Sequence, residues 1–294
     1  MIVVTAPTGN IGRQVLENLL KVEAQVRVIV RDPSKLPDGV RSRVEVIVGS
    51  HGDKQVVQAA LTGADTLFWL VPPDPRAHSV EAAYVDFSRP VADAISTHGV
   101  KRVVIVTALG RGTPMAEHSG YVKASLAMDD LIGGTGVAMR QLTMPSFMDN
   151  ILFQIDPIKN KGMFFSPIDS DLKLPSCATR DIAAVAASLL TDDSWSGQDH
   201  VGVLGPEDLS WNDMAAIMTD VLGKPIRFQQ ISFDDYKAQF LKNGMSEPMA
   251  QGMTDMAIAK NEGLDKAEAR TPENTTPTSF RTWCETALKP AVAA

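Results

Sequence analysis

Cysteine, histidine and basic residues are scarce in this sequence. Its two cysteines, Cys177 and Cys284, lie too far apart for the spacing of a disulfide framework or a zinc site. The five histidines are scattered, so we expect no bound metal. Lysine and arginine (28) are outnumbered by aspartate and glutamate (35), which gives a formal net charge of −7. A chain this acidic has no general attraction to phosphate backbones, and we expect no nucleic-acid partner.

Long hydrophobic runs are also absent. No apolar stretch approaches the roughly 20 residues that a membrane helix needs, so we expect no membrane association. Met1 leads directly into an apolar run at residues 2–5, which leaves no room for the charged start of a signal peptide. We therefore expect a cytoplasmic protein. With 294 residues, it can form one large domain or one domain with a smaller addition.

The first half of the chain alternates short apolar runs with helical patterns. We predict strands at residues 2–5, 26–30, 44–48, 65–71, 102–107 and 136–142. We predict helices at residues 11–20, 54–61, 79–98 and 120–132, the third of them ending at Gly99. Strands that alternate with crossover helices form a parallel sheet. The expected fold class is therefore α/β, with a Rossmann-like, doubly wound parallel sheet.

The second half is richer in Pro, Asp and Met and has a different pattern. Thr179 is placed as the N-cap of a helix that runs to Leu190, and Ser210 with Asp213 resembles a capping box. We predict further helices at residues 234–241 and 247–259, and an extended surface segment at residues 271–278. These features favour a smaller, mostly helical C-terminal cap. The helix near residues 179–191 is expected to pack back on the sheet.

A glycine turn follows the first predicted strand and opens the first predicted helix. Its residues are Thr8, Gly9, Asn10, Ile11 and Gly12. Gly9 lets a pyrophosphate approach the backbone, Gly12 lets the helix pack close to the strand, and the helix N-terminus attracts phosphate. Ala6 stands where the extended fingerprint has its first glycine, which we expect to require a negative φ. We predict that the turn binds a dinucleotide; the alternative is a plain turn with no ligand.

The end of the second strand discriminates between dinucleotides. Arg31 follows that strand, and a basic residue there suits a 2′-phosphate, whereas an acid suits a free ribose 2′-hydroxyl. Asp32 precedes Pro33, a combination typical of a helix start, so we assign Asp32 a capping role. Lys35 adds positive charge nearby. We therefore expect NADP(H) as the cofactor in preference to NAD(H).

The order and spacing of these segments resemble the NmrA-like family of atypical short-chain dehydrogenases/reductases. The resemblance covers nearly the whole chain and is carried by the glycine turn, by residues 30–35, 63–65, 100–102 and 180–183, and by Trp211. Members include NAD(P)H-dependent quinone reductases, triphenylmethane dye reductases, isoflavone-reductase-like enzymes and redox-sensing regulators. The quinone and dye reductase branch is closest in length and in its C-terminal portion.

A binding site is expected at the carboxyl ends of the predicted strands. Leu70 and Val71 would flank the adenosine half of the cofactor, and Thr107 and Ala108 end the fifth strand on the same side. The resemblance implies that a loop passes beside the nicotinamide ring; it consists of Met144, Pro145, Ser146 and Phe147. We divide the chain into an NAD(P)-binding domain at residues 1–150 and a substrate-binding cap at residues 151–294.

The acid–base dyad of typical short-chain dehydrogenases is missing. That dyad is a tyrosine with a lysine four residues later, on the same helix face. Here Tyr121 is followed by Lys123, and residue 125 is Ser125. The resemblance makes Lys123 a candidate for contacting the nicotinamide ribose, and His118 is a candidate for protonating a product. The alternatives are a solvated lysine and a structural histidine.

Four methionines fall at spacings of four, four and three, and thus form one helical stripe: Met245, Met249, Met253 and Met256. Core packing explains such a stripe. The alternative is an adaptable wall against a flat aromatic substrate, because methionine packs well on rings.

The leading hypothesis is an NADPH-dependent reductase that transfers hydride to a quinone or a similar flat, electron-poor small molecule. Positioning alone can suffice for such a strong electrophile. The competing hypothesis is a non-enzymatic NADP(H) sensor that acts through protein partners. A sugar-nucleotide epimerase is a third hypothesis, and the missing dyad counts against it. Whether the chain forms a homodimer is left open.

Overall fold

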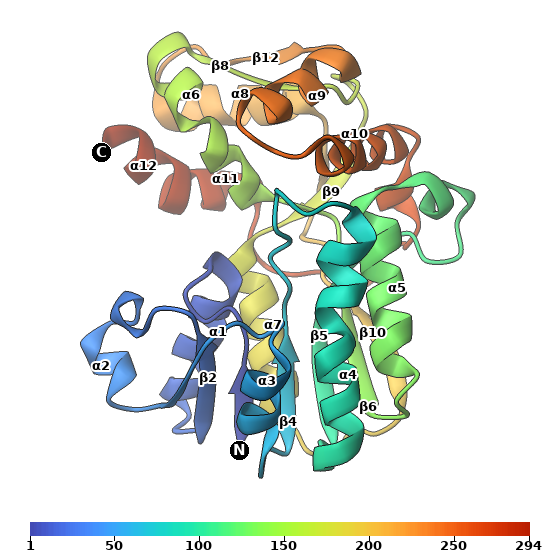
Figure 1. Ribbon diagram of the computed structural model, residues 1–294. Helices are drawn as coiled ribbons and strands as arrows, with labels where there is room; N and C mark the ends of the chain where they lie inside the picture. Colours follow the sequence, from blue (N-terminus) through green and yellow to red (C-terminus); the bar gives the residue numbers. More distant parts are fainter.

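The computed structural model describes all 294 residues, and its centre is a seven-stranded sheet (Figure 1). Every neighbouring pair of strands in it runs parallel. In spatial order the strands are β10 (Gln198–Gly202), β6 (Ala138–Met144), β5 (Arg102–Ala108), β4 (Thr66–Trp69), β1 (Ile2–Val4), β2 (Val26–Val30) and β3 (Glu45–Val48). The predicted doubly wound parallel sheet is confirmed.

Helices cover both faces of this sheet. The helices α1 (Asn10–Lys21) and α7 (Thr179–Thr191) bury apolar side chains against one face. The other face is covered by α3 (Lys54–Leu61), α4 (Phe87–His98) and α5 (Tyr121–Gly133). A π-helical turn at Ala82–Asp86 leads into α4, and the short α2 (Asp38–Arg41) precedes β3. The helix near residues 179–191 thus packs on the sheet, as its sequence indicated.

Two features of the sheet differ from the sequence-based expectation. β10 belongs to the sheet although it lies well beyond residue 150, so the sheet draws on a segment that we assigned to the cap. β6 begins at Ala138 and extends to Met144, because Gly136 adopts a positive φ of 79° and forms a turn before it. Met144 is therefore a strand residue rather than part of a loop. The proposed division of the chain at residue 150 stays a prediction.

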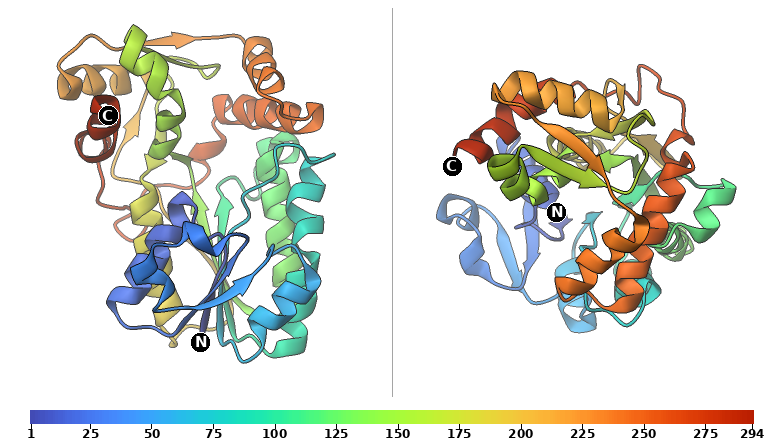
Figure 2. Two further views of the ribbon diagram at one scale, coloured as in Figure 1. Left: turned by 60° about the vertical axis from the view of Figure 1, so that its left-hand side comes forward. Right: turned by 90° about the horizontal axis from the view of Figure 1, so that it is seen from above.

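The rest of the chain forms a second layer over one end of the sheet (Figures 1 and 2). Its helices are α6 (Ile155–Lys161), α8 (Trp211–Leu222), α9 (Phe233–Lys242), α10 (Glu247–Asn261), α11 (Phe280–Trp283) and α12 (Lys289–Ala293). Its strands are β7 (Ser146–Phe147), β8 (Met163–Ser166), β9 (Leu174–Cys177), β11 (Asp208–Leu209) and β12 (Arg227–Gln230). The helices predicted at residues 234–241 and 247–259 are present, whereas these short strands lacked a clear pattern. We refer to this layer as the cap.

Local capping agrees with the sequence in one case and differs in another. Ser210 and Asp213 form the expected capping box at the start of α8. Thr179, however, is the first helical residue of α7 and not its N-cap; Ala178 holds that position. The amide of Thr179 donates instead to Asp149 Oδ2 at 3.0 Å. A side chain distant in sequence therefore caps α7, which no local pattern can indicate.

The segment at residues 271–278 is not the exposed linker that its composition suggested. Asn274, Thr276 and Thr278 are buried. Thr278 donates from its amide and its hydroxyl to the two carboxylate oxygens of Asp181. The segment therefore connects the cap to α7 through buried hydrogen bonds. None of the helices combines the length and the apolar character that crossing a bilayer requires.

The cap meets the sheet layer through a direct backbone contact between α10 and the start of α5. Gly120 has a φ of 54°, and a Cβ on it would lie 2.1 Å from the carbonyl oxygen of Gly252. A Cβ on Gly252 would in turn lie 2.5 Å from Cγ2 of Val80. Any larger residue at position 120 or 252 would therefore collide with a neighbour. The two glycines allow α10 to lie against the start of α5.

The turn between β1 and α1 is equally tight. A Cβ on Gly12 would lie 2.2 Å from the carbonyl oxygen of Ala6, so this glycine permits the close approach of helix and strand that its position predicted. Ala6 itself has a φ of 48°. The expectation of a negative φ was therefore wrong: the turn keeps the left-handed conformation that its glycine-containing counterparts adopt easily, and the alanine methyl strains it.

We expect Gly12→Ala to lower the free energy of unfolding by about 1–3 kcal/mol, because the added methyl must push α1 away from the Ala6 carbonyl. Urea denaturation measures this change. Gly39→Ala is the matched control, since a Cβ on Gly39 meets nothing within 4 Å. Equal stability of the two variants would show that the close approach at Gly12 is unimportant.

Candidate functional site

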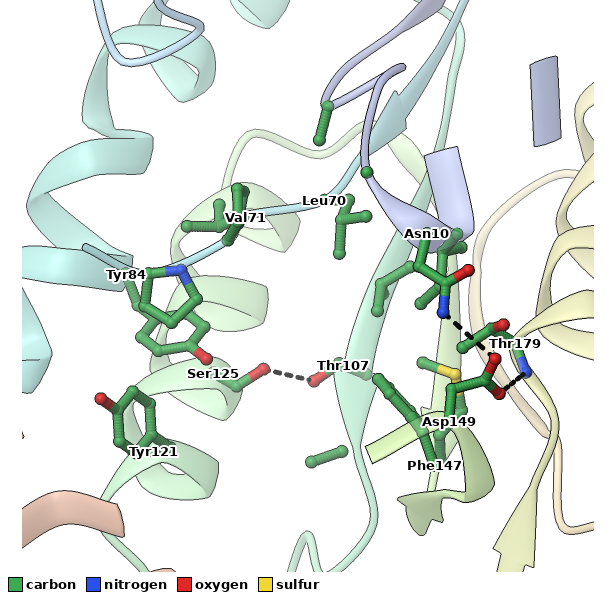
Figure 3. Close-up of a pocket in the computed structure, with 18 of the residues that line it drawn as sticks. Asn10, Leu70, Val71, Tyr84, Thr107, Tyr121, Ser125, Phe147, Asp149 and Thr179 are labelled. Atoms are coloured by element: carbon green, nitrogen blue, oxygen red, sulfur yellow. Dashed lines mark hydrogen bonds between the residues drawn. The ribbon is translucent and has the colours of Figure 1, made fainter. Parts of the chain in front are cut away.

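A cavity of about 670 Å³ opens at the carboxyl ends of the central strands. It lies where the strand order reverses between β1 and β4, the usual ligand position in such sheets. Most of the predicted binding residues line it: Thr8, Gly9, Asn10, Ile11, Arg31, Leu70, Val71, Thr107, Ala108, Met144, Pro145, Ser146 and Phe147. Figure 3 shows several of them, contributed by separate strands and helices.

The glycine turn forms one wall of the cavity and suits a phosphate group. Gly9 is the N-cap of α1, and no side chain caps the helix there. The first turn of α1 also contains no acidic residue. The amides at a helix start lack partners within the helix, so this end offers free donors and a positive dipole. The turn thus fits the pyrophosphate of the expected dinucleotide.

A free cation lies at the end of β2, beside this wall. Arg31 lines the cavity, is exposed, and makes no ion pair or side-chain hydrogen bond. Asp32 has a structural role. Its side chain caps a short 3-10 turn and accepts hydrogen bonds from the amide and the hydroxyl of Ser34, and these bonds lower the pKa of Asp32. The capping role assigned to Asp32 is confirmed. We expected Lys35 to lie near the 2′-phosphate, but its side chain is exposed and lies outside the cavity.

His51 is a further lining residue near Arg31, and no sequence pattern singled it out. Its ring contacts Trp69 and Phe87 edge-on, at centroid distances of 5.2 and 4.8 Å. Burial lowers the pKa of His51 to about 4, so the ring is neutral at pH 7. Its Nε2 is buried and has no hydrogen-bond partner in the structure. This nitrogen can accept or donate one bond to a ligand in the cavity.

Asp149 connects three parts of the chain beside the glycine turn (Figure 3). Its Oδ1 accepts from Asn10 Nδ2 at 3.1 Å, and its Oδ2 accepts from the Thr179 amide at 3.0 Å. Through the second of these bonds, Asp149 caps α7. It also links the first residue of α1 to the start of α7, which fixes the glycine turn relative to α7.

The far end of the cavity is lined by hydroxyl groups (Figure 3). Tyr84 and Tyr121 contact each other edge-on, with ring centroids 5.9 Å apart. Burial raises the pKa of Tyr121 to about 12 and raises that of Tyr84 as well, so both phenols are protonated. Thr107 Oγ1 lies 3.1 Å from Ser125 Oγ. Ser125 also lines the cavity, at the position where the dyad of typical short-chain dehydrogenases would have its lysine.

The structure does not bring the two predicted catalytic residues to the cavity. Lys123 is exposed on α5, where its ammonium donates to the carbonyl of Glu117. Tyr121 and Ser125 face the cavity from the same helix. Residues two apart point in nearly opposite directions on a helix, so Lys123 faces outward. His118 is also exposed and lies 2.9 Å from Glu262. Both predicted roles need correction.

The cap closes the far end with apolar and ion-paired groups. The methionine stripe packs against α5, and Met256 reaches the cavity while Met249 is fully buried. The stripe thus serves core packing, and Met256 also lines the cavity. Lys260 also lines the cavity, but both oxygens of Asp265 accept from its ammonium within a buried ion pair. No group of three or more side chains here could hold a metal ion.

Two family models match this chain. One, described as NAD(P)H-binding, matches residues 7–193. The other, described as the NmrA-like family, matches residues 135–285. Each covers more than half of the chain, and together they span both the sheet layer and the cap.

Individual proteins with similar sequences and structures carry reductase names. The chain is 29% identical to the NAD(P)H azoreductase of Xenophilus azovorans, over 87% of this chain and 86% of the relative. It is 23% identical to quinone oxidoreductase 2 of Escherichia coli, over 90% and 89%. The fold matches that of Citrobacter sp. triphenylmethane reductase complexed with NADP(H), with a TM-score of 0.77 and 21% identity, over 96% and 98% of the two chains.

We expect the buried, neutral His51 to make stability depend on pH. The unfolded chain binds a proton at this histidine near pH 6.5, whereas the folded chain does so only near pH 4. Stability should therefore fall as the pH is lowered from about 6.5 to 4. His51→Phe, which keeps the aromatic contacts, should flatten this part of the profile of melting temperature against pH.

The control is His78→Gln, which removes an exposed histidine and should leave the acid sensitivity in place. If the His51→Phe and wild-type profiles run parallel between pH 6.5 and 4, the assignment of this sensitivity to His51 is wrong.

Proposed function

The chain belongs to the NAD(P)H-binding and NmrA-like families, and from this membership we propose that it transfers hydride from NADPH to a quinone or a similar flat, electron-poor acceptor. The membership confirms the resemblance noted in the sequence. The chain is an NAD(P)H-dependent oxidoreductase, as are the reductases to which it is similar. The choice of NADPH and the class of acceptor are the proposed parts.

The arrangement of one continuous cavity carries the proposal. The free amides of the α1 N-terminus and the unpaired Arg31 line one part of the cavity, whereas Tyr84 and Tyr121 line another. When bound, the cofactor supplies a hydride from its nicotinamide ring. The chain holds phosphates at the first part and leaves an aromatic, uncharged space at the second. That space suits a flat acceptor held against the nicotinamide.

Phe153 supports an aromatic acceptor. It lines the cavity, yet 89% of it is exposed to solvent, which is unusual for so large an apolar side chain. Met256 lies in the same lining and offers a polarizable surface that packs well on rings. Stacking on such groups positions a flat molecule without a charged anchor. Positioning of this kind is the main demand of hydride transfer to a strong electrophile.

The missing tyrosine–lysine dyad counts against a sugar-nucleotide epimerase. Tyr121 lines the cavity without a lysine beside it, and burial holds its pKa at about 12. A phenol with so high a pKa is a poor acid and cannot act as a base near pH 7. Reduction of a quinone does not require a base to remove a proton from the substrate, so this site suits reduction better than epimerisation.

The first test is turnover. Purified protein mixed with NADPH should oxidise it when a benzoquinone, a naphthoquinone, an azo dye or a cationic triphenylmethane dye is added, followed by NADPH absorbance. Reactions without acceptor exclude slow oxidation by dissolved oxygen. We expect at least the quinones to be reduced over many cycles.

The same experiment separates the enzyme from a non-enzymatic sensor. Tight and selective NADPH binding in a fluorescence titration, with no turnover of any acceptor, would rule out the reductase. The sensor hypothesis would then account for the cavity and for Arg31.

The second test concerns the cofactor. Arg31→Asp should weaken NADPH binding about ten- to a hundredfold, because a hydrogen-bonded ion pair with the 2′-phosphate is worth about 1.5–3 kcal/mol. NADH binding should change far less. Isothermal titration with both nucleotides measures the difference.

Lys35→Asp is the matched control, since it makes the same change of charge four residues away and outside the cavity. Equal losses for NADPH and NADH in Arg31→Asp, or equal effects of the two variants, would refute the assignment of Arg31 to the 2′-phosphate.

A further inference from the structure

A buried carboxyl group lies directly behind the hydroxyl-lined end of the cavity. Asp129, on α5, is fully buried and does not line the cavity itself. Thr107 Oγ1 lies 2.7 Å from Asp129 Oδ2 and 3.1 Å from Ser125 Oγ. Thr107 and Ser125 both line the cavity. The three side chains therefore form a hydrogen-bonded row from the protein interior to the ligand space, and Figure 3 shows its Ser125–Thr107 end.

Reduction of a quinone or an azo group creates a need for a proton. Hydride delivers two electrons and one hydrogen, and the other oxygen or nitrogen is left with a negative charge. The usual donor in related folds is the tyrosine beside a lysine, and here that lysine is replaced by Ser125. Tyr121 keeps a pKa of about 12 and is a weak acid. The cavity thus lacks the usual proton donor.

We propose, building on the reductase function above, that Asp129 supplies this proton through Thr107 and Ser125. Asp129 Oδ2 releases its proton to Thr107 Oγ1, Thr107 passes its own hydroxyl proton to Ser125 Oγ, and Ser125 protonates the reduced acceptor. Three O–H bonds break, at the carboxyl and the two hydroxyls. Three bonds to hydrogen form, at the two hydroxyls and the acceptor. Asp129 becomes a carboxylate and regains its proton from water.

The hydroxyl groups suit this transfer because each can donate one hydrogen bond and accept two. With Asp129 ionised, Thr107 donates to it and Ser125 must donate to Thr107. With Asp129 protonated, both bonds can reverse, and the Ser125 hydroxyl hydrogen then points into the cavity. The hydrogen bonds of the row therefore have two possible directions, and the protonation state of Asp129 decides between them. Ser125 touches the acceptor, whereas Thr107 and Asp129 act through it.

The surroundings of Asp129 allow it to hold a proton at neutral pH. Its Oδ1 is buried without a hydrogen-bond partner, an arrangement far less costly for a neutral carboxyl than for an anion. The charged groups that act on it are Arg111, in the loop after β5, and Asp130, its neighbour on α5. Burial is the largest effect and raises the pKa of Asp129 to about 7.

Arg111 provides the connection to water and stabilises the spent carboxylate. Its Nη2 lies 3.3 Å from Asp129 Oδ2, and its side chain is 44% exposed. The guanidinium also donates to Asp130, which is exposed. Asp129 therefore has Arg111 on the solvent side and Thr107 on the cavity side. A proton can leave Asp129 toward Thr107, and a proton from solvent can return past Arg111.

The test compares two acceptors in the full-length enzyme with NADPH. A quinone needs a proton after hydride transfer, whereas a cationic triphenylmethane dye becomes neutral on accepting hydride and needs none. Asp129→Asn, which keeps shape and hydrogen bonding, should lower the turnover number for the quinone about a hundredfold, the scale of general acid catalysis. Turnover of the dye and the affinity for NADPH should be unchanged. Asp130→Asn is the matched control on the same helix.

The pH profile is a second, independent measurement. Turnover of the quinone by the wild type should fall as the pH rises through about 7, because Asp129 then loses its proton. Arg111→Gln should move this fall to higher pH, since loss of the cation disfavours the carboxylate. Asp129→Asn should remove this fall in turnover.

Thr107→Ser should keep the relay, and Thr107→Val should slow turnover of the quinone as Asp129→Asn does.

The infrared band of a protonated carboxyl gives a measurement that does not depend on turnover. The wild type should show this band at pH 6 and lose it as the pH rises, and Asp129→Asn should lack it. Absence of the band at pH 6 overturns the relay. Equal slowing of quinone and dye by Asp129→Asn, or no slowing of the quinone, also overturns it. If the wild type reduces no acceptor at all, the reductase proposal itself has failed. This result differs from the outcomes above, in which the enzyme is active and only the relay is wrong.

Discussion

The whole site depends on a backbone contact between two glycines. The carbonyl of Gly252 lies so close to Gly120 that a single added carbon would collide with it. This contact lets α10 rest on the start of α5, and it places Met256 and Lys260 of the cap in the same cavity as Tyr121 of the sheet layer. Without it, the cavity would lose the part of its wall that Met256 and Lys260 form.

The charges around the cavity are distributed unevenly, and this has a chemical consequence. Arg31 is a free cation near the glycine turn, where it can meet phosphate. At the other end, Lys260 is neutralised by Asp265 within a buried pair, and the phenols are protonated. An anionic group is therefore favoured at one end only. In the proposed function, this asymmetry orients the dinucleotide and leaves the far end for the acceptor.

The lining residues at strand ends and in the glycine turn were predictable, whereas those on α5 and α10 were not. Leu70, Thr107 and Met144 reach the cavity because parallel strands bring their carboxyl ends to one edge, and strands are evident from their apolar runs. Lys123 was misplaced because the face of α5 depends on where that helix starts. Its start at Tyr121 is fixed by the contact of Gly120 with Gly252 of the cap, which lies 132 residues later in the sequence.

The sequence by itself determined the parallel sheet, the glycine turn, the tight packing at Gly12 and the family. Each of these depends on local patterns: apolar periodicity, residue spacing and the small size of glycine. The tertiary structure alone decided the rest. It gave Ala6 a positive φ, placed β10 in the sheet, turned Lys123 outward and set Asp129 behind Thr107. These features follow from contacts between distant segments, and such contacts leave no periodic trace in the sequence.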